Sequence, residues 1–376
     1  MIVARVTRIA LIAGLCCGAT ARAADIDPRL KLGVSLPLSG PLEPYARDTL
    51  AGIETALEEW REQNPAAAGH VTLLIEDDHG LISAGEDAAK RLIDVKKVDV
   101  IIGSLMSDVT IAIGAVAGAA RRPVVTPSAV DIDVTKRGGA YVFRTCLAET
   151  QQGTILGILA ARHLKKKAAV TIATEGSEGA KALTQRFNKT FSSLGGIIAG
   201  EFTVAAGRTE LRETVDQVMR KQPDVVLLAL AHPDVARVGV ALREAGLKPP
   251  LIGPDGWDTP TLKLGEGHFF AAHFAADETT PHVAAFRARY ERLRRKQPSV
   301  FAAQGYEAAK VVFDAFRRAQ SARSEALVRA LARTDLALNA GTLTFDPSRD
   351  AIRSMAIMST TATGTRFFTR IAPTLP

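Results

Sequence analysis

Residues 32–60 read LGVSLPLSGPLEPYARDTLAGIETALEEW, and this stretch holds one complete strand-to-helix unit. An apolar run at 32–34 is followed by a turn rich in proline and glycine, and apolar residues then recur at helical spacing. The residues of that apolar face are Leu50, Ile53, Leu57 and Trp60. Such spacing predicts an amphipathic helix that buries one face. A buried strand, a turn and an amphipathic helix form the repeating unit of parallel α/β proteins.

The same unit recurs along the chain. Short β-branched apolar runs stand at 71–75, 98–102, 124–125, 168–172, 225–230 and 251–252. Such runs are typical of parallel strands buried on both faces. The alternation is followed by a helical block that includes 286–316 and by a β-rich tail at 341–371. The predicted fold class is therefore α/β, with right-handed crossovers between parallel strands.

So many strands and helices exceed one comfortable core, so we predict two doubly wound parallel-sheet lobes. Three hinge crossings are expected, around 144–150, 272–280 and 340–345. The first lobe then comprises 24–145 plus 277–340, and the second comprises 146–276 plus 341–376.

The first 23 residues are predicted to be a secretory signal peptide. Arg5 and Arg8 precede an apolar stretch at 9–19, and Ala21-Arg22-Ala23 fits the small-x-small cleavage rule. The apolar stretch has about half the length that a bilayer crossing needs. Cys16 and Cys17 lack the small-residue context of a lipidation site, so lipid anchoring is not expected. The mature chain from Ala24 is expected to be exported to the periplasm.

Composition excludes several classes of protein. The 376 residues are 47% hydrophobic, 23% charged and 5% aromatic, which is ordinary for a globular chain. Its 47 basic and 40 acidic residues give +7, and removal of the three arginines in residues 1–23 leaves +4. The basic residues are dispersed rather than gathered with aromatics, so a nucleic-acid partner is not expected. Cys146, alone in the mature chain, is interpreted as a buried small hydrophobe.

Enzyme motifs are absent from the sequence. It contains no GxGxxG after a strand, no Walker loop and no HExxH, GxSxG or CxxC motif. We therefore expect no enzymatic activity, no cofactor and no metal.

Polar and turn residues follow the predicted strands, where open α/β sheets bind ligands. Ser107 and Ser128 precede or begin helical segments in the first lobe, where free backbone N–H groups could hold a carboxylate. In the second lobe, Asp255 could pair with a cationic or hydrogen-bond-donating group, and Trp257 could cover an apolar or cationic part of a ligand. The alternative interpretation is that the serines are N-caps and that Gly-Pro-Asp-Gly at 253–256 is a plain turn.

Several short motifs resemble those of one family, in order over nearly the whole mature chain. They are KLGVSLPLSGP at 31–41 with Tyr45, EDD at 76–78, IGS at 102–104, VTPSA at 125–129, FRT at 143–145 and GPDG at 253–256. Together they resemble the branched-chain amino-acid type of exported substrate-binding proteins of ABC transporters. The resemblance implies the type I periplasmic binding protein fold, whose two lobes close on a ligand like a Venus flytrap.

The resemblance also implies a set of ligand-binding residues. Tyr45, Met106, Ser107, Ser128, Ala129 and Val130 would form the first lobe's cleft wall, and Gly176, Ala231 and Asp255 would face them. Ser107 would hold a ligand carboxylate, and Asp255 would take an ammonium group. The family's threonine is absent at Val130, and its aromatics are absent at Gly176 and Ala231. These losses enlarge the cleft and favour a bulkier carboxylate or amide, aromatic ones included.

The function implied is capture of an amino acid or aromatic acid by a monomeric periplasmic protein that delivers it to an ABC transporter permease. The alternative left open by the sequence is a ligand-sensing or partner protein for a periplasmic receptor or redox system, with no transport role.

Overall fold

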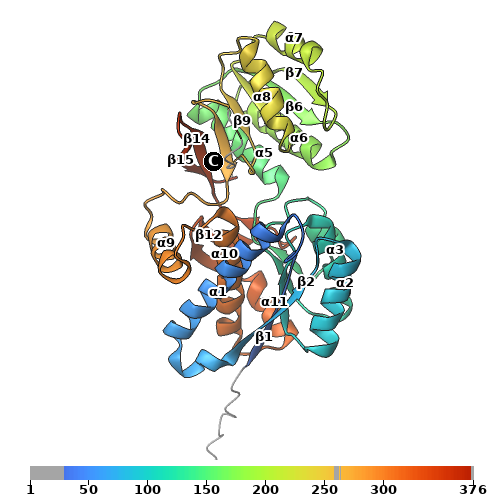
Figure 1. Ribbon diagram of the computed structural model, residues 1–376, viewed down its shortest axis with the longest axis vertical. Helices are drawn as coiled ribbons and strands as arrows, with labels where there is room; N and C mark the ends of the chain where they lie inside the picture. Colours follow the sequence, from blue (N-terminus) through green and yellow to red (C-terminus); the bar gives the residue numbers. More distant parts are fainter. Residues whose placement is uncertain (1–28, 258–261, 263, 374–376) are drawn as a thin grey trace, which may run out of the picture.

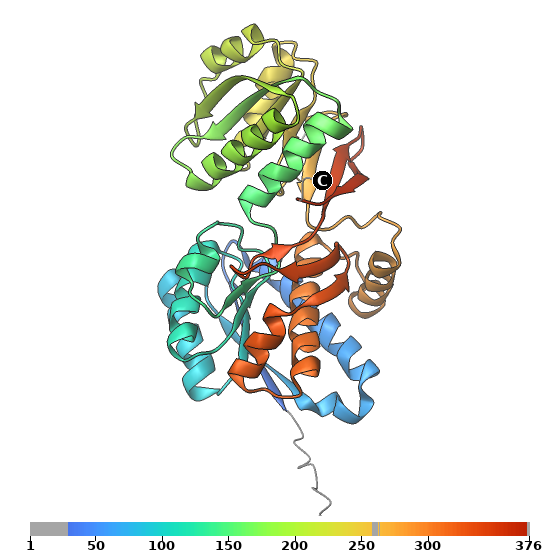
Figure 2. The ribbon, with the colours of Figure 1, turned by 180° about the vertical axis from the view of Figure 1, so that it is seen from behind.

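A computed structural model of the chain describes residues 29–257, 262 and 264–373. The described residues form two lobes, one above the other in Figure 1 and seen from behind in Figure 2. The predicted signal peptide at 1–23 lies outside the described residues.

The first lobe is built on a five-stranded sheet of order β2-β1-β3-β4-β5, in which every neighbouring pair is parallel. Its strands are β1 (Leu30–Leu36), β2 (Val71–Asp77), β3 (Val100–Gly103), β4 (Val124–Thr126) and β5 (Val142–Arg144). The apolar runs predicted at 32–34, 71–75, 98–102 and 124–125 all fall in or beside these strands. Central strands are buried on both faces, which is why their sequences are continuously apolar.

The first lobe's helices cover both faces of this sheet (Figure 1). They are α1 (Glu43–Gln63), α2 (Ile82–Lys90), α3 (Ser107–Ala119), α4 (Val134–Arg137), α9 (Pro281–Arg294), α10 (Val300–Ala319) and α11 (Ser324–Ala332). Helices α1 and α10 approach closely because two glycines meet the facing backbone. A Cβ on Gly52 would overlap the carbonyl oxygen of Ala302, and a Cβ on Gly305 would overlap that of Thr49. Three residues of the predicted apolar face of α1 are buried, Trp60 being 8% exposed, and the fourth, Leu50, is partly buried.

The second lobe holds a seven-stranded sheet of order β15-β14-β10-β9-β8-β6-β7. Its strands are β6 (Ala168–Thr174), β7 (Ile197–Val204), β8 (Val225–Ala229), β9 (Leu251–Gly253), β10 (Phe269–Ala272), β14 (Met355–Thr360) and β15 (Thr365–Ile371). Its helices are α5 (Glu149–Ile158), α6 (Glu178–Ser193), α7 (Arg212–Arg220) and α8 (Asp234–Glu244). Strands β6 to β10 pair in parallel, whereas β14 and β15 join antiparallel at one edge.

The chain passes between the lobes three times among the described residues. The first two passages come after β5 and after β10 (Figure 1). The third lies near Arg353, not at 340–345, and here the predicted boundary is wrong. Strand β12 (Gly341–Phe345) pairs with β11 (Asp335–Leu338) and β13 (Ala351–Ile352) in a small separate sheet. Leu343 and Ala351 are fully buried in the first lobe's core, so residues 341–352 belong to that lobe.

Two further observations concern residues singled out by the sequence. Cys146 is 1% exposed, and burial raises the pKa of its thiol to about 12, which confirms its interpretation as a buried residue. Within the described part of the chain, no helix is long and apolar enough to cross a membrane.

Candidate functional site

A cavity of about 290 Å³ lies where the two lobes meet, and both lobes line it. Loops that follow β3 and β4 and the starts of α1 and α10 form its first-lobe side. The loops that follow β9 and β10 form its second-lobe side. Five of the predicted site residues line this one cavity: Tyr45, Met106, Ser128, Val130 and Asp255.

The first-lobe wall combines apolar side chains with unused polar groups. The Ser128 hydroxyl oxygen is buried and has no hydrogen-bond partner. Met106 is the residue just before α3 and its side chain does not cap the helix, whereas the Asp108 carboxylate accepts a hydrogen bond from the backbone N–H of Val109 at 2.8 Å. The first N–H groups of a helix have no partner within the helix, and they carry its positive dipole end. The wall can therefore hydrogen-bond a negatively charged or carbonyl oxygen.

The second-lobe wall carries an acid held between two neighbours. The Asp255 backbone N–H donates to Gln152 Oε1 at 3.1 Å, and Asp255 Oδ2 lies 3.2 Å from His273 Nε2. Burial on its own would raise the pKa of Asp255, but the contacts with His273 and Gln152 outweigh it, and the pKa is lowered. Asp255 is thus a carboxylate at neutral pH, and its side chain remains 31% exposed toward the cleft.

Sequence reasoning missed several residues that line this cavity. The most consequential are His273, which pairs with Asp255, and Phe301 and Gln304 on the first turns of α10. His273 directly follows β10, at the predicted crossing of 272–280, but the sequence analysis assigned it no part in the cleft. Phe301 lies beside Tyr45, with ring centroids 4.9 Å apart. The position of Ser299 before the apolar pattern of α10 could have marked a helix start at the cleft.

Two predicted residues lie behind the first-lobe wall. The Ser107 hydroxyl accepts a hydrogen bond from the backbone N–H of Asp131 at 3.3 Å. Ala129 is 1% exposed, and its carbonyl accepts from Arg144. Neither residue lines the cavity, so Ser107 stabilises the loop that carries Ser128 and Val130. Direct ligand contact by Ser107 or Ala129 stays a prediction.

On the second lobe, three predicted residues lie away from the cavity. Gly176 and Ala231 are exposed at the ends of β6 and β8, and their contact with a ligand also stays a prediction. Trp257 is 2% exposed and packs in the second lobe's core, with its ring centroid 6.2 Å from that of Phe270. The expectation that Trp257 faces the ligand is wrong for this arrangement of the lobes. Gly253 explains the packing, because a Cβ there would overlap the indole.

Comparison with known proteins identifies the family. The model of the periplasmic binding protein family matches residues 29–365. The chain belongs to the periplasmic binding protein family. A Leu/Ile/Val-binding protein of Rhizobium johnstonii is 25% identical over 309 residues, which are 80% of this chain and 83% of the relative. A second Leu/Ile/Val-binding protein homologue, from Brucella melitensis, is 26% identical and covers 82% of this chain and 83% of its own length.

The fold comparison agrees with the sequence comparison. The crystal structure of a leucine-binding protein from Thermotoga maritima superposes with a TM-score of 0.76 at 26% identity. The match covers 92% of this chain and 99% of that one. The type I periplasmic binding fold, predicted from motif order, is therefore confirmed.

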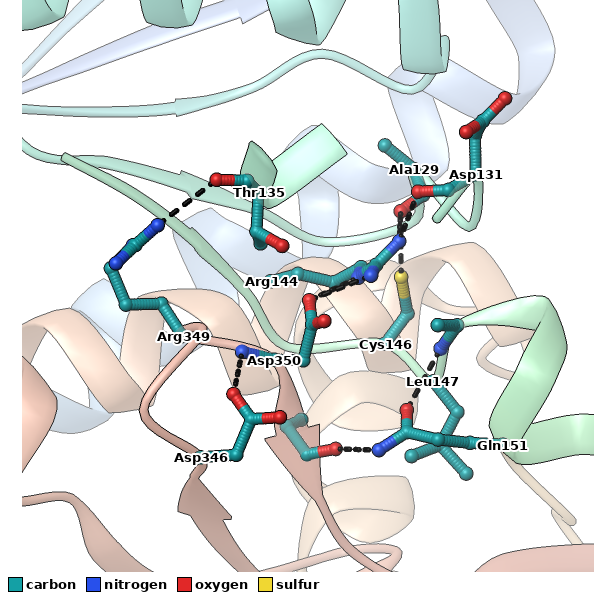
Figure 3. A network of polar contacts seen from close by, with 12 residues as sticks. Ala129, Asp131, Thr135, Arg144, Cys146, Leu147, Gln151, Asp346, Arg349 and Asp350 are labelled. Carbon is teal, nitrogen blue, oxygen red and sulfur yellow. Dashed lines mark hydrogen bonds and ion pairs between the residues drawn. The ribbon is translucent and has the colours of Figure 1, made fainter. Parts of the chain in front are cut away.

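In this periplasmic binding protein, the crossings are tied to one another by a buried polar network, drawn in Figure 3. The Arg144 guanidinium is fully buried and donates to Asp350 Oδ1 from Nε at 2.9 Å and from Nη2 at 2.6 Å. Its Nη1 donates to the carbonyls of Ala129 and Asp131. Arg144 thereby connects the loop behind Ser128 to the segment that leads into the third crossing.

A second buried ion pair lies beside the same crossings. Arg353 and Glu307 are each 4% exposed at the side chain and meet in a two-point contact, at 2.7 and 2.9 Å. Arg353 also donates to the carbonyl of Thr145 in the first crossing. The first and third crossings are thus fastened to each other and to α10.

Proposed function

We propose that the chain is an exported, monomeric solute-binding protein that captures a small carboxylate- or amide-bearing ligand between its lobes and delivers it to an ABC transporter permease. The ligand class is an amino acid or an aromatic acid. The observation that supports this proposal most directly is the cavity that both lobes line, with an unpartnered hydroxyl on one wall and a carboxylate on the other. We propose no catalytic activity, because the family is one of binding proteins.

The first-lobe wall supports a carboxylate or amide head group. The Ser128 hydroxyl supplies one donor, and the start of α3 beside Met106 supplies backbone N–H groups other than that of Val109, which is held by Asp108. A helix start with free N–H groups is a general site for anions. A ligand oxygen would replace water there with donors that are already in position.

The second-lobe wall supports a ligand that also carries an amino group. Asp255 is an ionised carboxylate oriented by Gln152 and paired with His273. An ammonium group beside it would form a charge-assisted hydrogen bond. A ligand held by Ser128 and Asp255 together touches both lobes, so its binding favours the closed arrangement through differential contacts.

Relatives support the same class of ligand. The Rhizobium and Thermotoga proteins are described as binding leucine, isoleucine or valine, or leucine alone. Their similarity covers most of both chains, so the two-lobed architecture required for capture is shared as a whole.

The first test is a thermal-shift screen of residues 24–376, refolded from denaturant to remove any copurified ligand. The panel contains leucine, isoleucine, valine, phenylalanine, benzoate and benzamide, and calorimetric titration follows each positive result. A ligand that binds the folded state raises the unfolding midpoint by mass action. No shift with any member, from protein shown to be folded by circular dichroism, contradicts the proposed ligand class.

The role of Asp255 is tested by Asp255→Asn, which keeps the shape of the side chain and removes its charge. We expect affinity for an aminated ligand to fall at least about tenfold, because a desolvated ammonium loses its charged partner. Asp216→Asn, in an exposed position on α7, is the matched control and is expected to have no effect. Equal affinities for wild type and Asp255→Asn in calorimetry would remove this role.

A further inference from the structure

A second and larger cavity, of about 600 Å³, adjoins the first along the junction of the lobes. The two cavities share lining residues on both sides. Tyr45 and Phe301 line both from the first lobe, and Gly256 and Ala272 line both from the second. The paired rings of Tyr45 and Phe301 therefore form a continuous aromatic wall from one cavity to the next.

The lining of the second cavity is mainly apolar. Phe274 comes from the second crossing, Val300 from the start of α10 and Met358 from β14. Figure 1 places β14 and β15 on the same side of the upper lobe as α9 lies in the lower lobe. The cavity thus lies beside the second crossing and is lined by both lobes, which makes it sensitive to their closure.

The charged groups at this cavity are acidic, and they already have partners. Asp48 forms an ion pair with Lys296 at 2.5 Å, and Asp277 accepts a hydrogen bond from the backbone N–H of Phe367 at 2.7 Å. Among the described lining residues there is no lysine or arginine. An anionic group would therefore meet like charge and no cation here, whereas an apolar group would be desolvated at little polar cost.

The two cavities also differ in volume. Pockets for small molecules span about 300 to 1,000 Å³, so the first cavity is at the lower limit and the second lies well inside the range. A ligand with a short side chain uses the first cavity alone. The second cavity provides room for a part of the ligand that such an amino acid does not have.

We propose that the physiological ligand is elongated, with its carboxylate or amide head in the first cavity and an apolar aliphatic or aromatic tail in the second. This inference rests on the proposed function and names the ligand class within it. The tail packs against the Tyr45–Phe301 wall and the Met358 side chain. Closure of the lobes then buries the tail as well as the head.

The test is an affinity series in which only tail length changes. Calorimetry measures L-norvaline, L-norleucine and L-α-aminooctanoate, and the unbranched alkanoates from butanoate to decanoate. Each methylene buried in an apolar site strengthens binding about fourfold. We expect affinity to rise by about that factor per methylene once the tail extends beyond the first cavity.

A blocking variant assigns the gain to the second cavity. Thr365 is exposed at the start of β15 and lines the second cavity but not the first, so Thr365→Trp places an indole in the tail's path. The matched control is Thr203→Trp, an exposed threonine on β7 at the opposite edge of the same sheet. Thr365→Trp is expected to abolish the gain for long tails and leave short ligands unaffected, and Thr203→Trp to change neither.

The outcomes separate this inference from the proposed function. Affinity that is highest for short tails and falls for longer ones in the wild type overturns the elongated ligand, while the proposed function stands. Gains for long tails that survive in Thr365→Trp also overturn it. If neither series nor the earlier panel binds, the proposed function itself fails, and this inference fails with it.

Discussion

The Glu149 carboxyl provides a sharp test of the electrostatics near the first crossing. Glu149 is the first residue of α5, and its carboxyl packs against the backbone of Gly179 at the start of α6. Its Oε2 is buried and has no hydrogen-bond partner. Burial, together with the negative charges of Asp131 and Asp255, raises the pKa of Glu149 to about 7.

The direction of the pH effect follows from linkage. In the unfolded chain Glu149 has its usual pKa of 4.5, so between that value and about 7 the folded protein holds a proton that the unfolded chain has lost. This contribution to stability is fully present below the unfolded pKa and is lost as the pH rises through the folded pKa. The two pKa values set an upper limit of about 3 kcal/mol. Because Glu149 is only partly buried, we expect about 1 to 2 kcal/mol.

The perturbation is Glu149→Gln, which keeps the side chain's shape and is neutral at every pH. Urea unfolding of wild type and variant is compared at about pH 5 and about pH 8. The variant should gain about 1 to 2 kcal/mol relative to the wild type between the two pH values. Glu178→Gln, whose side chain is 82% exposed at the start of α6, is the control and should show no such change. A difference between Glu149→Gln and wild type that is the same at both pH values refutes the reasoning.

Two further predictions concern stability. Arg353→Met leaves Glu307 charged and buried, so the free energy of unfolding should fall by about 3 to 5 kcal/mol. The double variant with Glu307→Gln should recover at least half of that loss. Strictly additive effects of the two substitutions in urea unfolding would show that the pair does not interact. Gly52→Ala places a methyl group against the Ala302 carbonyl and should cost about 1 to 3 kcal/mol. Gly118→Ala is the control, because Gly118 is also in a helix but a Cβ there meets open space, and it should be neutral or stabilising by up to about 1 kcal/mol. Equal losses of stability in both variants would contradict the close contact of α1 and α10.

Most strands that sequence revealed are those whose burial makes them continuously apolar, and β2, a partly buried edge strand, is an exception. The run at 98–102 covers the first three residues of β3, a strand that is buried at all four positions. Strand β7 was missed because it lies at the sheet edge, where polar residues such as Glu201 and Thr203 interrupt the apolar pattern. The third crossing was misplaced for a related reason. Strands β12 and β14 are both rich in β-branched or apolar residues, and only pairing partners show that they belong to different sheets.

Some residues of the candidate site could likewise be predicted from the sequence, whereas the positions of others depend on packing alone. Asp255 could be found because a polar residue in a turn after an apolar run marks the ligand edge of a parallel sheet. Trp257, two residues later, has an aromatic side chain that could also contact a ligand. The direction of that side chain depends on Gly253, a residue that the sequence does not mark as important. Gly253 has no Cβ, so the indole turns inward over the strand and fills the core instead of the cleft. His273 is the opposite case to Trp257. Its sequence context does not indicate a residue of the cleft, and the pairing of β10 beside β9 brings it to Asp255. A glycine and a strand pairing thus decide which of these side chains face the cleft.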